Sequence, residues 1–141
     1  MSLDQDIRRL LRVELLGALT PEALGLLAFS SRKQRLHAGD RLYDEGETLD
    51  AALVILSGEI ELSGAGLAPR RVGNEATLAE LALFTPVEAP TSAVAASEAV
   101  VMRVTRETMT RVLEEFPQTA EATHARLSAQ LARFAAEAQR V

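Results

Sequence analysis

Residues that could bind an anion lie in the stretch Thr77–Ala96, which contains a short helical turn, a loop between two prolines and a run of small residues. Thr77 and Glu80 have the spacing of a capping box, which predicts that a helix begins at Thr77. The start of a helix exposes backbone N–H groups that suit a phosphate. After the loop, the hydroxyls of Thr91 and Ser92 could donate hydrogen bonds to the same anion. We therefore treat this stretch as a candidate anion site.

The rest of the chain offers little for catalysis. It has no cysteine and only two histidines, His37 and His124, so a thiolate nucleophile and the clustered ligands of a metal-dependent cupin are missing. It also contains no Gly-x-Ser-x-Gly motif and no P-loop. We predict that the chain is not an enzyme and holds no metal or cofactor. A cupin-like enzyme is the disfavoured alternative.

Length and composition restrict the class of protein. The chain has 141 residues, of which 48% are hydrophobic, enough to bury one core. A net charge of -5 argues against direct binding to nucleic acid, which needs a surplus of Lys and Arg. No apolar run approaches the roughly 20 residues that span a bilayer, and residues 1–6 do not resemble a signal peptide. Together with the lack of cysteine, these features predict a cytoplasmic protein with no membrane contact.

The elements that must position the candidate site are short strands separated by glycine turns. Residues 31–37 form an extended polar stretch, residues 52–56 an apolar strand and residues 59–62 an alternating strand, before a glycine hairpin at 64–66. Residues 99–104 form the last strand. This pattern predicts a mainly β fold, an antiparallel β-roll or jelly roll, with flanking helices. We expect N-terminal helices at 1–30, the roll at 31–104 and C-terminal helices at 105–141.

Capping residues place the flanking helices. Ser2 is the predicted N-cap of a first helix that ends near Gly17, and Thr20 with Pro21 begins a second helix that ends at about Phe29. Thr105 caps a helix that Pro117 stops or restarts. These signals predict helices on both sides of the roll.

The C-terminal segment carries an apolar repeat. Its members recur at alternating steps of four and three residues, as in the seam of a coiled coil: Ala120, His124, Leu127, Leu131, Phe134, Ala138 and Val141. The repeat predicts a homodimer formed through a long C-terminal helix. The alternative is a helix that folds back on its own roll.

Together these motifs resemble the cyclic-nucleotide-binding domains of the catabolite-activator and kinase-regulatory families. Gly39, Gly46 and Gly58 fall at the turn positions of that β-roll, and Glu80–Leu83 matches its phosphate-binding cassette. The resemblance implies a regulatory domain for cAMP or cGMP, in which Glu80 accepts a hydrogen bond from the ribose 2′-hydroxyl. Its other predicted role is the capping box.

Two residues depart from the cassette. Ala79 stands where the family has glycine, and Pro90 aligns with the arginine that holds the cyclic phosphate. No Arg or Lys occurs between residues 74 and 101, so Arg70 or Arg71 would have to turn inward to replace it. The residues of the candidate pocket are Ala79, Glu80, Leu81, Ala82, Pro90, Thr91 and Ser92.

These departures predict a sensor that binds cyclic nucleotides weakly or not at all and acts through dimerisation or a protein partner. The alternative is a functional cAMP or cGMP sensor that holds the phosphate without arginine.

Overall fold

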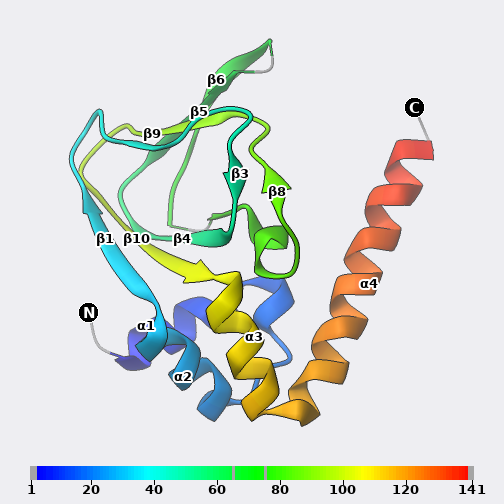
Figure 1. The fold of residues 1–141 in the computed structure, drawn as a ribbon. Helices are drawn as coiled ribbons and strands as arrows, with labels where there is room; N and C mark the ends of the chain where they lie inside the picture. The colour runs from blue at the N-terminus through cyan, green and yellow to red at the C-terminus, as the bar shows by residue number, and fades with distance from the viewer. Residues whose placement is uncertain (1–2, 65, 75, 140–141) are drawn as a thin grey trace. The chain divides into compact units, whose positions relative to one another are not determined.

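The structure is a computed structural model that describes residues 3–64, 66–74 and 76–139, with side chains to residue 136. The predicted cap at Ser2 lies outside the described residues. The chain divides into two compact units, Met1–Phe29 with Arg111–Val141, and Ser30–Thr110 (Figure 1).

Ser30–Thr110 holds the β-roll, and every strand pair in it is antiparallel. One sheet has the order β1-β10-β4-β7 and the other has the order β2-β9-β5-β6, with β3 and β8 as a separate pair. The strands are β1 (Arg32–Leu36), β2 (Arg41–Tyr43), β3 (Thr48–Leu49), β4 (Ala51–Ser57), β5 (Ile60–Gly64), β6 (Leu67–Val72), β7 (Thr77–Leu78), β8 (Val87–Glu88), β9 (Ser92–Ala95) and β10 (Ala99–Thr105). The predicted mainly β fold with flanking helices is confirmed.

The core of the roll follows from the sequence pattern of its strands. Residues 51–55 of β4 are all buried, as expected for a strand covered on both faces, whereas β5 alternates, with Ile60 and Leu62 more buried than Glu61. Leu53 and Ile55 of β4 share one cluster with Ile60 and Leu62 of β5. That cluster also includes Tyr43, Ala82 and Ala93. Burial raises the pKa of the Tyr43 phenol above its ordinary value.

The helices of the N-terminal segment are α1 (Leu3–Leu11), a 3₁₀ turn η1 (Glu14–Leu16) and α2 (Pro21–Ser30). The amide of Ala23 donates a hydrogen bond of 3.2 Å to Thr20 Oγ1, which confirms the predicted cap. The predicted end of the first helix near Gly17 is wrong. Val13 is extended, with φ -75° and ψ 123°, so α1 stops at Leu11 and η1 forms separately.

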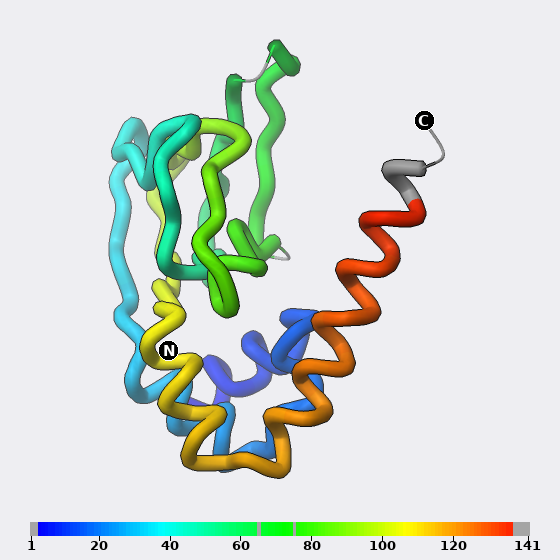
Figure 2. The backbone as a smooth tube through the Cα atoms, turned by 45° about the vertical axis from the view of Figure 1, so that its right-hand side comes forward, coloured from blue at the N-terminus to red at the C-terminus, as the bar shows by residue number. Residues whose placement is uncertain are grey.

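The C-terminal helices are α3 (Arg106–Glu115) and α4 (Pro117–Gln139), the latter a long continuous helix (Figure 2). The amide of Thr108 donates a hydrogen bond of 3.1 Å to Thr105 Oγ1, which confirms Thr105 as the cap of α3. Pro117 begins α4, where its missing N–H leaves no donor unsatisfied. Among the described residues, no helix has the length and hydrophobicity needed to cross a membrane.

Candidate ligand pocket and C-terminal helix

Ala79 has the backbone conformation of a glycine. Its φ is 57° and its ψ is 43°, and it is the only non-glycine with positive φ among the described residues. This left-handed conformation costs an L-residue roughly 1–2 kcal/mol, because Cβ approaches the neighbouring carbonyl. It turns the chain from β7 into the 3₁₀ helix η2 (Glu80–Leu83). The backbone at Ala79 thus keeps the left-handed conformation typical of glycine, although the residue is alanine.

The capping box predicted between Thr77 and Glu80 is wrong. Thr77 belongs to β7 and lies opposite Val54 of β4, so its backbone is extended and bonded within the sheet. The N-cap position of η2 falls instead on Ala79, which has no side chain able to accept a hydrogen bond. Pairing with β4 therefore overrides the local capping signal.

The two halves of the candidate pocket are anchored in one core. Ala82 and Ala93 are both completely buried in the core cluster of the roll, and Ala79 packs against that cluster. Glu80 and Leu81 are half-buried, as are Thr91 and Ser92. Because Ala82 and Ala93 have small side chains, η2 and β9 can both pack closely into this core.

The Ser92 hydroxyl is already engaged. The backbone N–H of Glu45 donates a hydrogen bond of 2.9 Å to Ser92 Oγ. A Cβ atom built on Gly64 would collide with the Glu45 carboxylate and would lie 3.8 Å from Cα of Thr91. Glu45 and Thr91 are therefore neighbours of the same glycine. The contact between Glu45 and Ser92 was not predicted from the sequence, because the two residues are 47 positions apart and no local motif connects them.

Pro90 lies where the family resemblance expects the arginine. It is exposed and borders a recess of about 450 Å³, together with Glu45, Gly46, Glu88 and Ala89. The loops on either side are bonded to each other, with the Gly46 amide 2.8 Å from the Ala89 carbonyl oxygen. This recess has two carboxylates and no basic residue in its lining. Its charge is opposite to that needed by a phosphate.

The arginines of β6 are not placed inward. Arg70 and Arg71 are both exposed, and Arg71 Nε lies 3.7 Å from the Glu61 carboxylate on the neighbouring strand. Both arginines therefore lie at the surface of the hairpin arm.

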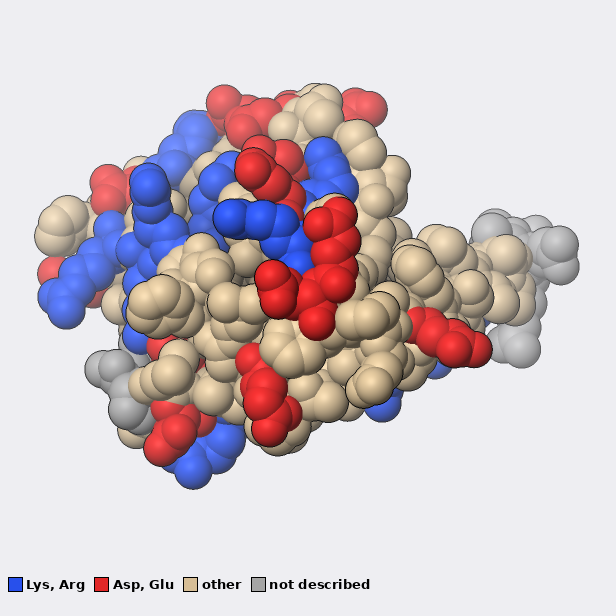
Figure 3. All heavy atoms as spheres, turned by 60° about the horizontal axis from the view of Figure 1, so that its bottom comes forward, with Lys and Arg blue, Asp and Glu red and all other residues tan. Residues whose placement is uncertain are grey.

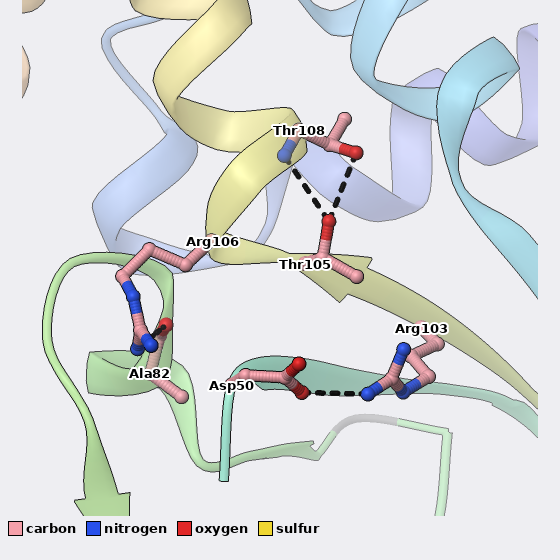
Figure 4. A network of polar contacts seen from close by, with 6 residues as sticks. All are labelled: Asp50, Ala82, Arg103, Thr105, Arg106 and Thr108. Atoms are coloured by element: carbon pink, nitrogen blue, oxygen red, sulfur yellow. Dashed lines mark hydrogen bonds and ion pairs between the residues drawn. The ribbon is translucent and has the colours of Figure 1, made fainter.

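A different arginine contacts the cassette (Figure 4). Arg106, the first residue of α3, donates a hydrogen bond of 3.2 Å from Nη1 to the carbonyl oxygen of Ala82 in η2. Its backbone N–H donates a second bond, of 2.9 Å, to the carbonyl of Asp50. The Asp50 carboxylate in turn pairs with Arg103 at 2.6 Å. Sequence reasoning missed Arg106, which follows Ala82 by 24 positions and matches no cassette motif.

On α4, the predicted seam lies mostly at the surface. Leu131 and Phe134 are 48% and 51% exposed, His124 is also exposed, and Ala120 and Leu127 are half-buried. The side chain of Ala138 lies outside the described residues. Such large apolar groups on one helix stripe leave unburied surface that a partner could cover.

The face of α4 next to the seam, one residue earlier along the helix, is polar and contacts η1. Arg126 Nη1 donates a hydrogen bond of 3.0 Å to the carbonyl of Glu14, and Arg133 pairs with the Glu14 carboxylate. Thr119, Thr123 and Gln130 are buried along this face. Arg126 and Arg133 therefore join α4 to η1 within one unit, while Leu131 and Phe134 of the seam stay exposed.

Comparison with known proteins agrees with this architecture. Residues 33–116, more than half of the chain, match the family model described as the cyclic nucleotide-binding domain. No curated protein matches the chain. A cyclic nucleotide-binding-like protein from Brucella abortus is 40% identical, with a TM-score of 0.72 over 77% of this chain and 97% of that chain.

Two regulators have similar structures. The N-terminal domain of a transcriptional regulator from Streptomyces coelicolor is 25% identical, with a TM-score of 0.81 over 94% of this chain and 96% of that chain. The catabolite activator protein of Thermus thermophilus is 24% identical, with a TM-score of 0.67 over 89% of this chain and 60% of that chain, and shares the fold. This chain belongs to the cyclic nucleotide-binding domain family.

Proposed function

We propose that this chain is a non-enzymatic regulatory domain in which cyclic-nucleotide binding is weakened or lost, and which acts through dimerisation or a protein partner. The observation that carries the proposal is the recess at Pro90, whose lining contains Glu45 and Glu88 but no cation. A cytoplasmic location, expected from the lack of cysteine, belongs to the same proposal.

Charge supports the loss of affinity. The phosphate of cAMP or cGMP is an anion, and binding it usually requires a guanidinium that supplies charge and paired donors. Here Pro90 supplies neither, and the carboxylates of Glu45 and Glu88 repel an anion placed beside it. Ser92 Oγ already accepts a hydrogen bond from Glu45, which restricts the orientation of its hydroxyl. Neutral donors still bond a phosphate, but they lack the opposite charge and the paired, bidentate geometry that a guanidinium supplies.

The exposed seam of α4 supports dimerisation. Leu131 and Phe134 are about half exposed, and a second copy of the same stripe would bury them. The related domain of a transcriptional regulator adds support for a regulatory role. In this proposal, α4 joins two copies through the face that does not contact η1.

One observation favours the second candidate, a functional sensor without the arginine. Ala79 keeps the left-handed backbone of the cassette glycine despite its cost, which preserves the orientation of the N–H groups at the start of η2. These N–H groups and the Thr91 hydroxyl would then hold the phosphate.

Titration calorimetry with cAMP and cGMP separates the two candidates. We expect no saturable binding by the unmodified chain and saturable binding by Pro90→Arg. Thr85→Arg, a substitution at an exposed residue outside the recess lining, serves as the charge-matched control and is expected to stay silent. Saturable micromolar binding by the unmodified chain would reject the proposal in favour of the second candidate.

A further inference from the structure

We propose that Glu121 and His124 of α4, together with the same two residues of a second copy, form a binding site for a divalent metal ion of the zinc class. This inference rests on the dimer through α4 that is proposed above. It adds to that dimer a ligand whose binding would strengthen it.

Glu121 and His124 are neighbours on one side of α4. They are three positions apart, and side chains at this spacing on a helix lie next to each other. A Glu and a His three positions apart are a pair that helical bundles use to bind metal ions. Both side chains are exposed, and neither has a hydrogen bond or an ion pair within the part of the chain that the structure describes. Both are therefore available as ligands.

The basic residues of α4 do not engage this pair. Glu121 has no Lys or Arg three or four positions away, so the usual ion pair along a helix is not open to it. Arg126, the next basic residue of α4, donates a hydrogen bond of 3.0 Å to the carbonyl of Glu14 in η1. Toward the grey C-terminal residues, the surface of α4 is mostly uncharged (Figure 3). A metal ion beside Glu121 would therefore not compete with a cation at these helix positions.

One chain supplies too few ligands for such a site. Among the described residues of a single chain, no group of three or more His, Cys, Asp or Glu side chains could hold a metal ion. The absence of a metal that the sequence predicts also concerns the ligands of one chain. Two copies supply two imidazoles and two carboxylates, and four ligands of these types match the tetrahedral coordination of Zn²⁺. The site is thus complete only in the dimer.

The seam places the pair where two copies would meet. His124 follows Ala120 by four positions and precedes Leu127 by three, which makes it an a position of the heptad. In a parallel two-stranded coil in register, equivalent a positions face each other, so the two His124 rings would meet with Glu121 beside them. A polar residue at this position lowers the stability of a coil. A metal ion bound by the imidazole nitrogens would offset that cost, because it gives buried polar atoms a partner.

Zinc titration of the full chain tests the site. Calorimetry with Zn²⁺ measures the stoichiometry, and sedimentation equilibrium compares the dimer in zinc with the dimer in a chelator. We expect one Zn²⁺ per two chains and a tighter dimer in zinc. His124→Ala should abolish zinc binding, and Glu121→Gln should weaken it by roughly tenfold or more. Both positions are exposed, so circular dichroism of the two variants should match that of the unmodified chain.

Two further variants serve as controls. His37→Ala is the matched control, because His37 is the other histidine of the chain and its Nδ1 lies 3.6 Å from the Glu98 carboxylate. This variant should bind zinc like the unmodified chain. Leu131→Lys disrupts the seam without removing a ligand, so it should lose the zinc together with the dimer.

The outcomes separate the metal site from the dimer itself. A chain that dimerises in chelator but binds no zinc overturns the metal site and leaves the proposed dimer standing. Unchanged zinc binding by His124→Ala, or one zinc per chain in monomeric Leu131→Lys, also overturns the shared site. A chain that stays monomeric with and without zinc overturns both the site and the dimer.

Discussion

Arg106 Nη1 lies 3.2 Å from the carbonyl oxygen of Ala82, so the first residue of α3 holds the 3₁₀ helix of the cassette. Ala82 is itself completely buried, which fixes the position of the carbonyl that Arg106 contacts. The cassette is thus held from its carbonyl side by a cation, although no cation lines the recess at Pro90. The same arginine uses its backbone N–H to bond Asp50 at 2.9 Å, which joins three segments of the roll.

Replacing Arg106 should loosen η2. We expect Arg106→Ala to lower the free energy of unfolding by about 1–2 kcal/mol, because a partly buried charged hydrogen bond is lost. Arg106→Lys should lose less, since lysine can still donate to the carbonyl. Urea unfolding measures both, and Arg111→Ala at an exposed position of α3 is the control. Equal stability of Arg106→Ala and Arg111→Ala would contradict the role assigned to the Ala82 contact.

Ala79→Gly should stabilise the chain, contrary to the usual effect of glycine. The native φ of 57° is strained for alanine but free for glycine, so we expect a gain of up to about 1 kcal/mol in the free energy of unfolding. Ala122→Gly on the exposed face of α4 should instead cost about 0.5–1 kcal/mol. Thermal and urea unfolding of the two variants give the comparison. A loss of stability on Ala79→Gly would mean that the left-handed backbone is not strained.

Gly17 should be needed for the contact between α4 and η1. A Cβ atom at Gly17 would lie 2.9 Å from Arg126 Nη1, so Gly17→Ala must displace the guanidinium that bonds the Glu14 carbonyl. Because the guanidinium is the far end of a flexible, exposed side chain, we expect only a small loss of stability, about 0.5 kcal/mol, with faster amide exchange along α4.

Gly25→Ala provides the matched control for this substitution. Gly25 lies in α2, and its added Cβ would meet only Ile7 Cδ1 of α1, at an ordinary contact distance of 3.7 Å. Because alanine favours a helix over glycine, this variant should gain about 0.5–1 kcal/mol. Similar losses for both glycine variants would rule out a specific role for Arg126.

Charge on the α4 seam should disrupt the proposed dimer. Leu131→Lys and Phe134→Lys place like charges where two copies would meet, so sedimentation equilibrium should shift from dimer to monomer. Both positions are about half exposed, which leaves the folded unit intact. Ala129→Lys, at an exposed position off the seam, should leave the dimer unchanged. A monomer in the unmodified chain would reject dimerisation through α4.

Several features of this protein follow from local sequence alone. Gly39, Gly46 and Gly58 adopt φ values of 94°, 87° and 82°, as turns that require a left-handed residue demand. Thr20 and Thr105 cap their helices because the cap involves residues only three positions apart. The seam of α4 could likewise be listed from its periodicity. These signals depend only on residues close together along the chain, so they can be recognised from the sequence without a structure.

Other features depend on which distant segments meet. Thr77 has the sequence of a helix cap, yet its pairing with Val54 makes it a strand. Glu45 reaches the Ser92 segment and Arg106 reaches Ala82 only because the roll brings residues 47 and 24 positions apart into hydrogen-bonding distance. The sequence determined the glycine turns, the caps and the missing cassette arginine. Tertiary structure decided that Glu45 and Glu88 lie beside Pro90 and that Arg106 contacts the cassette from its carbonyl side. Electrostatic and hydrogen-bonding energies depend on distance in space, which local sequence patterns do not define.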